Sequence, residues 1–142
     1  MTRRLALLLL TLAACHDDVQ TYTDEGRVCV EPEALAHFQA GDTLELTVTA
    51  PDCISACARV AQAECSAVVM GERIVVTSNA RWAPSDEVCI TLCAALQAHC
   101  EVTIPEAGHY TLVHGDDELP LELPSTPEAP PCTALPNAVA DS

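Results

Sequence analysis

The chain has 142 residues, a length that fits one domain. It carries 21 acidic against 6 basic residues, and the net charge of −15 repels nucleic acids and other polyanions. Composition therefore argues against nucleic-acid binding. Aromatic residues make up only 3% of the chain, so a core must come from Val, Ile, Leu and Ala.

The first 14 residues have the pattern of a secretory signal. Arg3 and Arg4 precede residues 5–14, in which Thr11 is the one polar member. Ten helical residues rise about 15 Å, roughly half of a bilayer's hydrocarbon core, so this segment is too short to span it. No later stretch is apolar and long enough to do so. The sequence therefore predicts export of the chain.

The end of this segment, Leu12-Ala13-Ala14-Cys15, resembles the lipobox of bacterial lipoproteins. The resemblance covers 15 residues and implies a diacylglycerol on the Cys15 thiol and cleavage between Ala14 and Cys15. It also implies palmitate or similar acyl chains and a membrane anchor. Because His16 rather than Asp follows the cysteine, the outer membrane is expected rather than the inner one. The alternative is an ordinary signal peptide that leaves a cysteine behind.

The cysteine count supports this interpretation. The chain has nine cysteines, and an odd number in an exported protein leaves one unexplained. If lipid occupies Cys15, eight remain that can pair fully in an oxidising compartment. These disulfide candidates are Cys29, Cys53, Cys57, Cys65, Cys89, Cys93, Cys100 and Cys132. Eight cysteines allow 105 connectivities, and the sequence does not choose among them.

Residues 15–26 are polar and acidic and are expected to form a flexible tether that lifts the domain off the membrane. A short strand is expected at 27–31, ended by Pro32, followed by a helical turn or loop over 33–40. Residues 43–50 alternate between apolar and polar, which is typical of a strand with one face in the core. Pro51 is expected to end that strand.

A hairpin is expected over 67–78 around Gly71, and a loop over 79–87. From Val88 to Ile104 every even position is apolar, but 17 residues is long for one strand, so two pieces with a bend near 93–95 are expected. A helix over 91–100 is the alternative, because Cys89, Leu92, Cys93, Leu96 and Cys100 also share a helical face.

Two more strands are expected at 109–114 and 118–123, joined by a turn at 115–117. Pro120 has no N–H to donate, so the second strand should lie at a sheet edge. The tail, 124–142, holds five of the ten prolines and is expected to be extended or disordered, unless Cys132 ties it back. Residues 27–123 thus form the predicted domain, an all-β antiparallel sandwich.

The segment Gly108-His109-Tyr110-Thr111 resembles the tyrosine corner of immunoglobulin-like folds. This resemblance implies that the Tyr110 hydroxyl reaches a backbone group a few residues upstream. The Cys…Trp…Cys framework of antibody domains is missing, so antibody-type disulfide pairing is not carried over. The expected interior side chains are Leu46, Val48, Val76, Leu92, Leu96, Ala98 and Tyr110.

Residues 53–65 and 89–100 resemble one another, each with a CxxxC pair and a later cysteine; chance similarity in an alanine-rich chain is the alternative. On a straight strand Cys89 and Cys93 would lie about 13 Å apart, whereas a disulfide needs Cα atoms within about 7 Å. These cysteines must therefore pair with other segments, or the chain must turn sharply between them.

The sequence contains no phosphate loop, nucleophile elbow, zinc-protease motif or redox CxxC pair, so a non-enzyme without a cofactor is expected. Residues 16–18 and 114–118 combine His with carboxylates, but neither has a specific metal-ligand spacing, and no metal site is assigned. The predicted function is a non-catalytic binding or structural module of the cell envelope. It would contact a protein or glycan through 79–87, with Arg81 and Trp82, or through 115–118. The alternative is an acidic module that binds or senses divalent cations.

Overall fold

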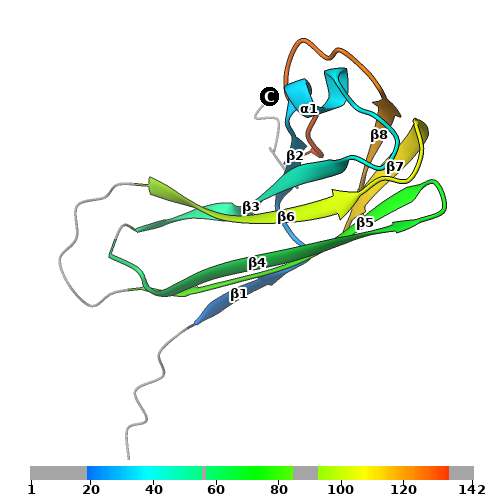
Figure 1. The fold of residues 1–142 in the computed structure, drawn as a ribbon. Helices are drawn as coiled ribbons and strands as arrows, with labels where there is room; N and C mark the ends of the chain where they lie inside the picture. The colour runs from blue at the N-terminus through cyan, green and yellow to red at the C-terminus, as the bar shows by residue number, and fades with distance from the viewer. Residues whose placement is uncertain (1–18, 56, 85–92, 135–142) are drawn as a thin grey trace, which may run out of the picture.

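Two β-sheets pack face to face in the computed structural model, which describes residues 19–55, 57–84 and 93–134 (Figure 1). The five-stranded sheet contains β1 (Gln20–Thr23), β4 (Arg59–Met70), β5 (Arg73–Ala83), β7 (Gly108–His114) and β8 (Asp117–Leu123). The three-stranded sheet contains β2 (Arg27–Val30), β3 (Thr43–Ser55) and β6 (Cys93–Thr103). One short helix, α1 (Pro32–Ala36), joins β2 to β3. The predicted all-β sandwich is confirmed. In the described part of the chain, no helix has the length and hydropathy to cross a bilayer.

Strand β5 organises the larger sheet. β4 pairs with β5 along one edge, while β1 and β7 follow one another along the other edge, at residues 79–82 and 73–76 of β5. All described pairs are antiparallel except β5 with β7. That pair is parallel because β7 arrives from β6 in the opposite sheet and not through a hairpin.

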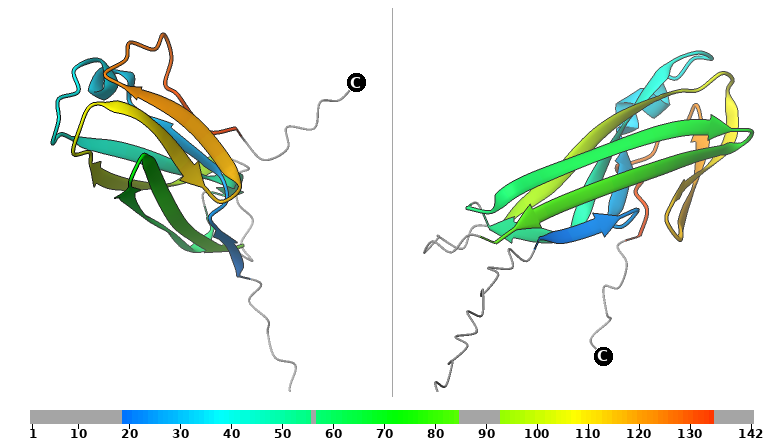
Figure 2. Two further views of the ribbon diagram at one scale, coloured as in Figure 1. Left: turned by 90° about the vertical axis from the view of Figure 1, so that its right-hand side faces the viewer. Right: turned by 90° about the horizontal axis from the view of Figure 1, so that it is seen from below.

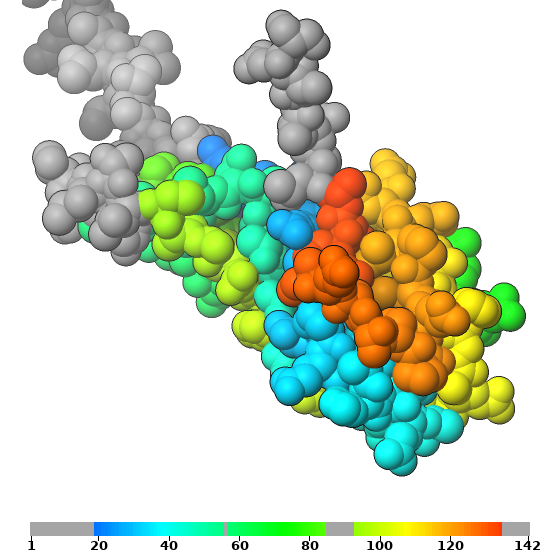
Figure 3. Space-filling view, turned by 90° about the horizontal axis from the view of Figure 1, so that it is seen from above, coloured from blue at the N-terminus to red at the C-terminus, as the bar shows by residue number. Residues whose placement is uncertain are grey.

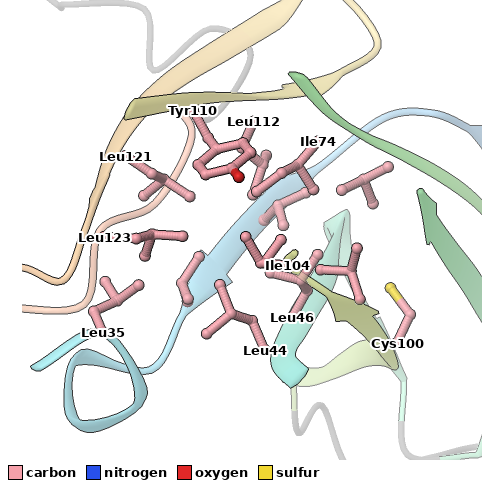
Figure 4. Packing of buried hydrophobic residues seen from close by; sticks show 14 of the residues in the cluster. Leu35, Leu44, Leu46, Ile74, Cys100, Ile104, Tyr110, Leu112, Leu121 and Leu123 are labelled. Carbon is pink, nitrogen blue, oxygen red and sulfur yellow. The ribbon is translucent and has the colours of Figure 1, made fainter. Parts of the chain in front are cut away.

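The core lies between the two sheets and follows the predicted alternation (Figure 4). Of the expected interior residues, Leu46, Val48, Val76, Ala98 and Tyr110 are buried. Leu96 is half-buried, and Leu92 lies outside the described residues. Inward side chains of both sheets thus meet in one apolar layer, as in other sandwiches.

Strand β6 decides between the two interpretations of its segment. Residues 93–103 form a strand paired with β3, so the strand prediction is confirmed there and the helical alternative is wrong for 93–100. The preceding piece, residues 88–92, lies outside the described residues, and the positions of the expected bend, 93–95, form the start of β6 and pair with β3. The β4–β5 hairpin around Gly71 is also confirmed.

The late strands bear out two local predictions. The Tyr110 hydroxyl donates a hydrogen bond of 2.9 Å to the Glu106 carbonyl, four residues upstream, as the tyrosine corner implies. β8 forms an edge of its sheet and contains Pro120, so the missing N–H costs no ladder bond.

Two strands run past their predicted ends. β3 continues through Pro51 to Ser55 because its register with β6 shifts between Thr49 and Cys53, and this irregularity takes Pro51 out of the ladder. β5 includes residues 79–83 of the expected loop 79–87, because β1 and β4 pair with both of its edges there. Both predictions failed because cross-strand partners outweigh local turn residues.

The predicted domain limits are too narrow at both ends. Residues 20–23 of the expected tether 15–26 form β1, whose backbone pairs with β5. The first part of the tail is also attached: Ser125 N–H donates to the Leu35 carbonyl at 3.1 Å and Thr133 N–H to the Val28 carbonyl at 2.9 Å. Figure 3 shows this tail, in orange and red, beside the cyan segment that contains α1. The folded unit therefore extends at least from Gln20 to Thr133.

The disulfides join distant segments. Cys29 pairs with Cys132, Cys53 with Cys93 and Cys65 with Cys100, with Cα atoms 4.1, 5.1 and 5.5 Å apart. Two of these bonds connect the similar segments 53–65 and 89–100 to each other, so pairing across segments is the correct alternative. Cys57 is also disulfide-bonded. Cys89 and Cys15 lie outside the described residues.

Candidate functional site

The outer face of the five-stranded sheet carries a row of valines. Val68 on β4 lies opposite Val75 on β5, and Val75 lies opposite Val113 on β7. These three side chains, together with Met70 at the end of β4, form what we call the valine patch. The right-hand view of Figure 2 looks toward β4 and β5 from this side of the molecule.

The valine patch combines exposed side chains with half-buried ones. Val68 is 53% and Met70 64% exposed, whereas Val75 and Val113 are half-buried by their neighbours. An ion pair between Arg73 and Glu118, 2.9 Å long, connects β5 to β8 beside the valines. Such an exposed pair adds little stability. An apolar centre with charged groups at its margin is the composition of a protein contact surface.

The rest of this face is polar. Toward the start of β4, Ser66 bonds to Thr77 at 2.8 Å, and Arg81 donates to the Gln62 side chain at 2.9 Å. Such cross-strand polar pairs are what a solvated sheet face normally carries. Val68, Val75 and Val113 therefore lie in the half of the face near Gly71.

The outer face of the three-stranded sheet provides a comparison within the same molecule. There Thr43 bonds to Thr103 at 3.0 Å and Gln97 to Thr49 at 3.2 Å. His99 lies 3.2 Å from the Glu45 carboxylate. This second face is built of polar pairs along β3 and β6, so apolar side chains in the valine patch are not a general property of the sheets.

A groove of about 610 Å³ lies on that second face. Its walls are the β3 irregularity near Pro51 and the attached tail at Ala129 and Pro130, and its lining includes the Cys29–Cys132 disulfide. Polar Thr47, Thr49 and Gln97 also line it.

The residues predicted to make contacts lie in β5, in the turn before β8 and at the start of β8, and 85–87 lie outside the described residues. Arg81 and Trp82 belong to β5, and Trp82 is half-buried with an indole N–H that has no partner among the described groups. The turn after His114 packs against Asp24, the residue that follows β1: a Cβ on Gly115 would lie 2.3 Å from the Asp24 carbonyl oxygen. Gly115 has φ +57, so glycine meets both the conformational and the steric requirement there.

His114 forms a buried polar contact that the sequence did not indicate. Its ring is 1% exposed, and Nε2 lies 2.8 Å from the Ser78 hydroxyl, while the Asp24 carboxylate accepts from the Ser78 N–H at 2.7 Å. Burial lowers the pKa of His114, and the Asp24 charge and the Gly26 backbone offset part of that shift.

This arrangement does not match an activated nucleophile. In such a site the carboxylate orients the base, but here Asp24 is bonded to the Ser78 backbone, and His114 is too buried for a substrate to reach. Ser78 and His114 instead join β5 to the end of β7 at the place where β1 ends.

The metal candidates remain without a described site. His114 is buried against Ser78 and is not part of an exposed ligand cluster, and residues 16–18 lie outside the described residues. Within 19–55, 57–84 and 93–134, no group of three or more His, Cys, Asp or Glu side chains is placed to hold a metal ion.

The sequence did contain a signal for the valine patch. Ile74, Val75 and Val76 are apolar in succession, as are Leu112 and Val113. A run of this kind predicts a strand that is apolar on both faces, whereas a half-solvated strand alternates. Comparison of the chain with protein-family models, with curated proteins and with solved structures found no match.

Proposed function

We propose that the chain is a bacterial lipoprotein whose immunoglobulin-like sandwich acts as a non-catalytic binding module of the cell envelope. In this proposal the anchoring membrane is the outer rather than the inner one. A lipid on Cys15 would hold it to the membrane, and the valine patch would contact a protein partner. Support for the anchor comes from Leu12-Ala13-Ala14-Cys15, and the disulfides fit an oxidising compartment.

The observation that carries the binding role is the alignment of Val68, Val75 and Val113 across three strands of an otherwise polar face. A protein partner would bury these valines, gaining roughly 25 cal/mol for each Å² of apolar area removed from water. The valine side chains are already ordered by the sheet, so little conformational entropy opposes that contact.

The proposal is tested by photo-crosslinking in bacteria that express the full chain. A crosslinker placed at Val75 should yield a discrete adduct with an envelope protein, and a crosslinker at Gln62 on the polar half should not. Val68→Glu should reduce the Val75 adduct at least tenfold, because a carboxylate would be desolvated at the contact.

Gln62→Glu is the matched control, since it adds the same charge to the same strand and face outside the valine patch. Equal adducts in the two variants would reject the valine patch as the contact surface. Cys15→Ala tests the anchor separately: the variant should leave the detergent phase. If it partitions and matures like the parent chain, the lipoprotein assignment is wrong.

A further inference from the structure

The distance between the proposed lipid and the folded domain is short. Only four residues separate Cys15 from Gln20, the first residue of β1. Five Cα–Cα steps span at most about 18 Å when fully extended. The expected tether of 15–26 would have been more than twice as long. Because β1 pairs with β5, residues 20–23 belong to the sheet and do not lengthen the tether.

One end of the sandwich is therefore kept close to whatever holds Cys15. The register identifies this end: Gln20 lies opposite Trp82, and Arg59 lies opposite Ala83. It is where β1 and β4 start and β5 stops, opposite the hairpin at Gly71 (Figure 1). We call it the β1 end.

Exposed apolar side chains gather at the β1 end. Val19 is 47% and Val60 is 53% exposed, and the half-buried Trp82 lies opposite Gln20, the residue after Val19. Val60 has φ +54, a conformation that β-branched residues rarely adopt, and it lies at the irregularity between Arg59 and Gln62. The backbone thus departs from the regular ladder at the place where this valine is exposed.

Arginine side chains lie at the β1 end of this acidic chain. Arg59 and Arg81 are two of the four arginines that follow residue 15, in a chain of net charge −15. Arg81 contacts the uncharged amide of Gln62, so this contact leaves its positive charge in place. Arginine can extend its guanidinium toward lipid phosphates while its stem remains on apolar surface.

We infer that the β1 end is a membrane-contact surface, with Val19 and Val60 entering the interface of the phospholipid bilayer and Arg81 at headgroup level. This inference rests on the lipid anchor proposed above. The occupant is the bilayer itself, because the 18 Å limit holds this end beside it whichever way the domain tilts.

The membrane contact places the valine patch at a distance from the bilayer. Nine Cα–Cα steps along β4 lead from Arg59 to Val68, which corresponds to about 30 Å along the strand. With the β1 end on the bilayer, the valine patch would project away from the lipid surface.

Trp82 makes the inference testable, since it is the only tryptophan in the chain. The lipidated chain is reconstituted into phosphatidylcholine vesicles. In each vesicle, a fraction of the lipids carries a nitroxide on the headgroup. Trp82 fluorescence should fall by more than half relative to unlabelled vesicles. A 20-residue Gly/Ser insertion between Asp18 and Val19 should weaken the quenching only partly if the contact itself is favourable.

Val19→Glu with Val60→Glu in the inserted chain should abolish the quenching, because neither carboxylate can enter the interface without loss of hydration. Val68→Glu in the same inserted chain is the control and should leave quenching unchanged. Vesicle flotation in each sample reports the anchor. Chains that float without quenching of Trp82 would overturn the membrane contact and leave the anchor standing, whereas chains that do not float would overturn the anchor.

Discussion

At the scale of single residues, His114 is the most unusual group in the described fold. A buried imidazole with one nitrogen bonded to the Ser78 hydroxyl is stable mainly in its neutral form. Asp24, with φ +52 and its carboxylate on the Ser78 N–H, keeps this corner in place. The contact joins residues from β5, β7 and the end of β1.

The lowered pKa of His114 predicts a pH dependence of stability. Because its pKa is depressed in the folded state, the unfolded chain binds the proton first as the pH falls below about 6.5. The free energy of unfolding should therefore decrease between the unfolded and the folded pKa and then level off. Urea unfolding at a series of pH values from 7.5 to 4.5 measures this slope.

His114→Gln provides the comparison, since glutamine keeps a polar side chain without titrating in this range. The variant should be less stable at pH 7.5 and should have a flatter profile between pH 6.5 and 5. A slope equal to that of the parent chain would show that His114 is not the group responsible.

At the scale of elements, the tail after β8 is held by one covalent bond and a few backbone hydrogen bonds. Cys132 pairs with Cys29 on β2, and Thr133, which is 2% exposed, accepts from the Val28 N–H at 3.0 Å. These contacts cover the outer edge of β2. The tail thus protects an edge strand that would otherwise present unpaired backbone groups.

Removing the tail disulfide should both destabilise the domain and free the tail. Cys29→Ala with Cys132→Ala should lower the free energy of unfolding by about 2–5 kcal/mol, the usual cost of losing a native disulfide in a small exported domain. Limited proteolysis should then cut the tail before the rest of the domain.

The Cys53–Cys93 bond supplies the matched control. It joins neighbouring strands of the three-stranded sheet, and its removal by Cys53→Ala with Cys93→Ala should leave the tail resistant to protease. Equal protection of the tail in both double variants would mean that hydrogen bonds, not the disulfide, hold it.

At the scale of the whole molecule, cross-links compensate for a core of modest side chains. The described disulfides close loops of 35, 40 and 103 residues, and Cys65–Cys100 joins one sheet to the other. A small domain with a modest core gains much of its stability from such bonds.

If Cys15 carries the proposed lipid, we expect the rest of the protein to contain no free thiol. Alkylation under denaturing, non-reducing conditions followed by mass spectrometry should add no label, because the eight cysteines after Cys15 can pair completely. Labelling at two or more sites would contradict the full set of disulfides and would favour a metal-binding or redox role.

The sequence by itself determined the features that depend on short-range pattern. Alternation predicted the buried faces of β3 and β6, Gly71 marked the hairpin, Pro120 marked an edge, and Tyr110 marked a corner that the Glu106 contact confirms. In each case the information lies within a few residues, because side-chain period and turn conformation are local properties.

Only the tertiary structure decided the features that depend on which strands become neighbours. β1 is a strand because β5 offers it an edge, and its own four residues include no aliphatic side chain that would predict a buried strand. The valine row needs the registers of β4, β5 and β7 together, and the Ser78–His114 contact joins residues 36 apart. The disulfide partners likewise follow from proximity after folding. Register and pairing are collective results of packing two sheets, so no single segment contains them.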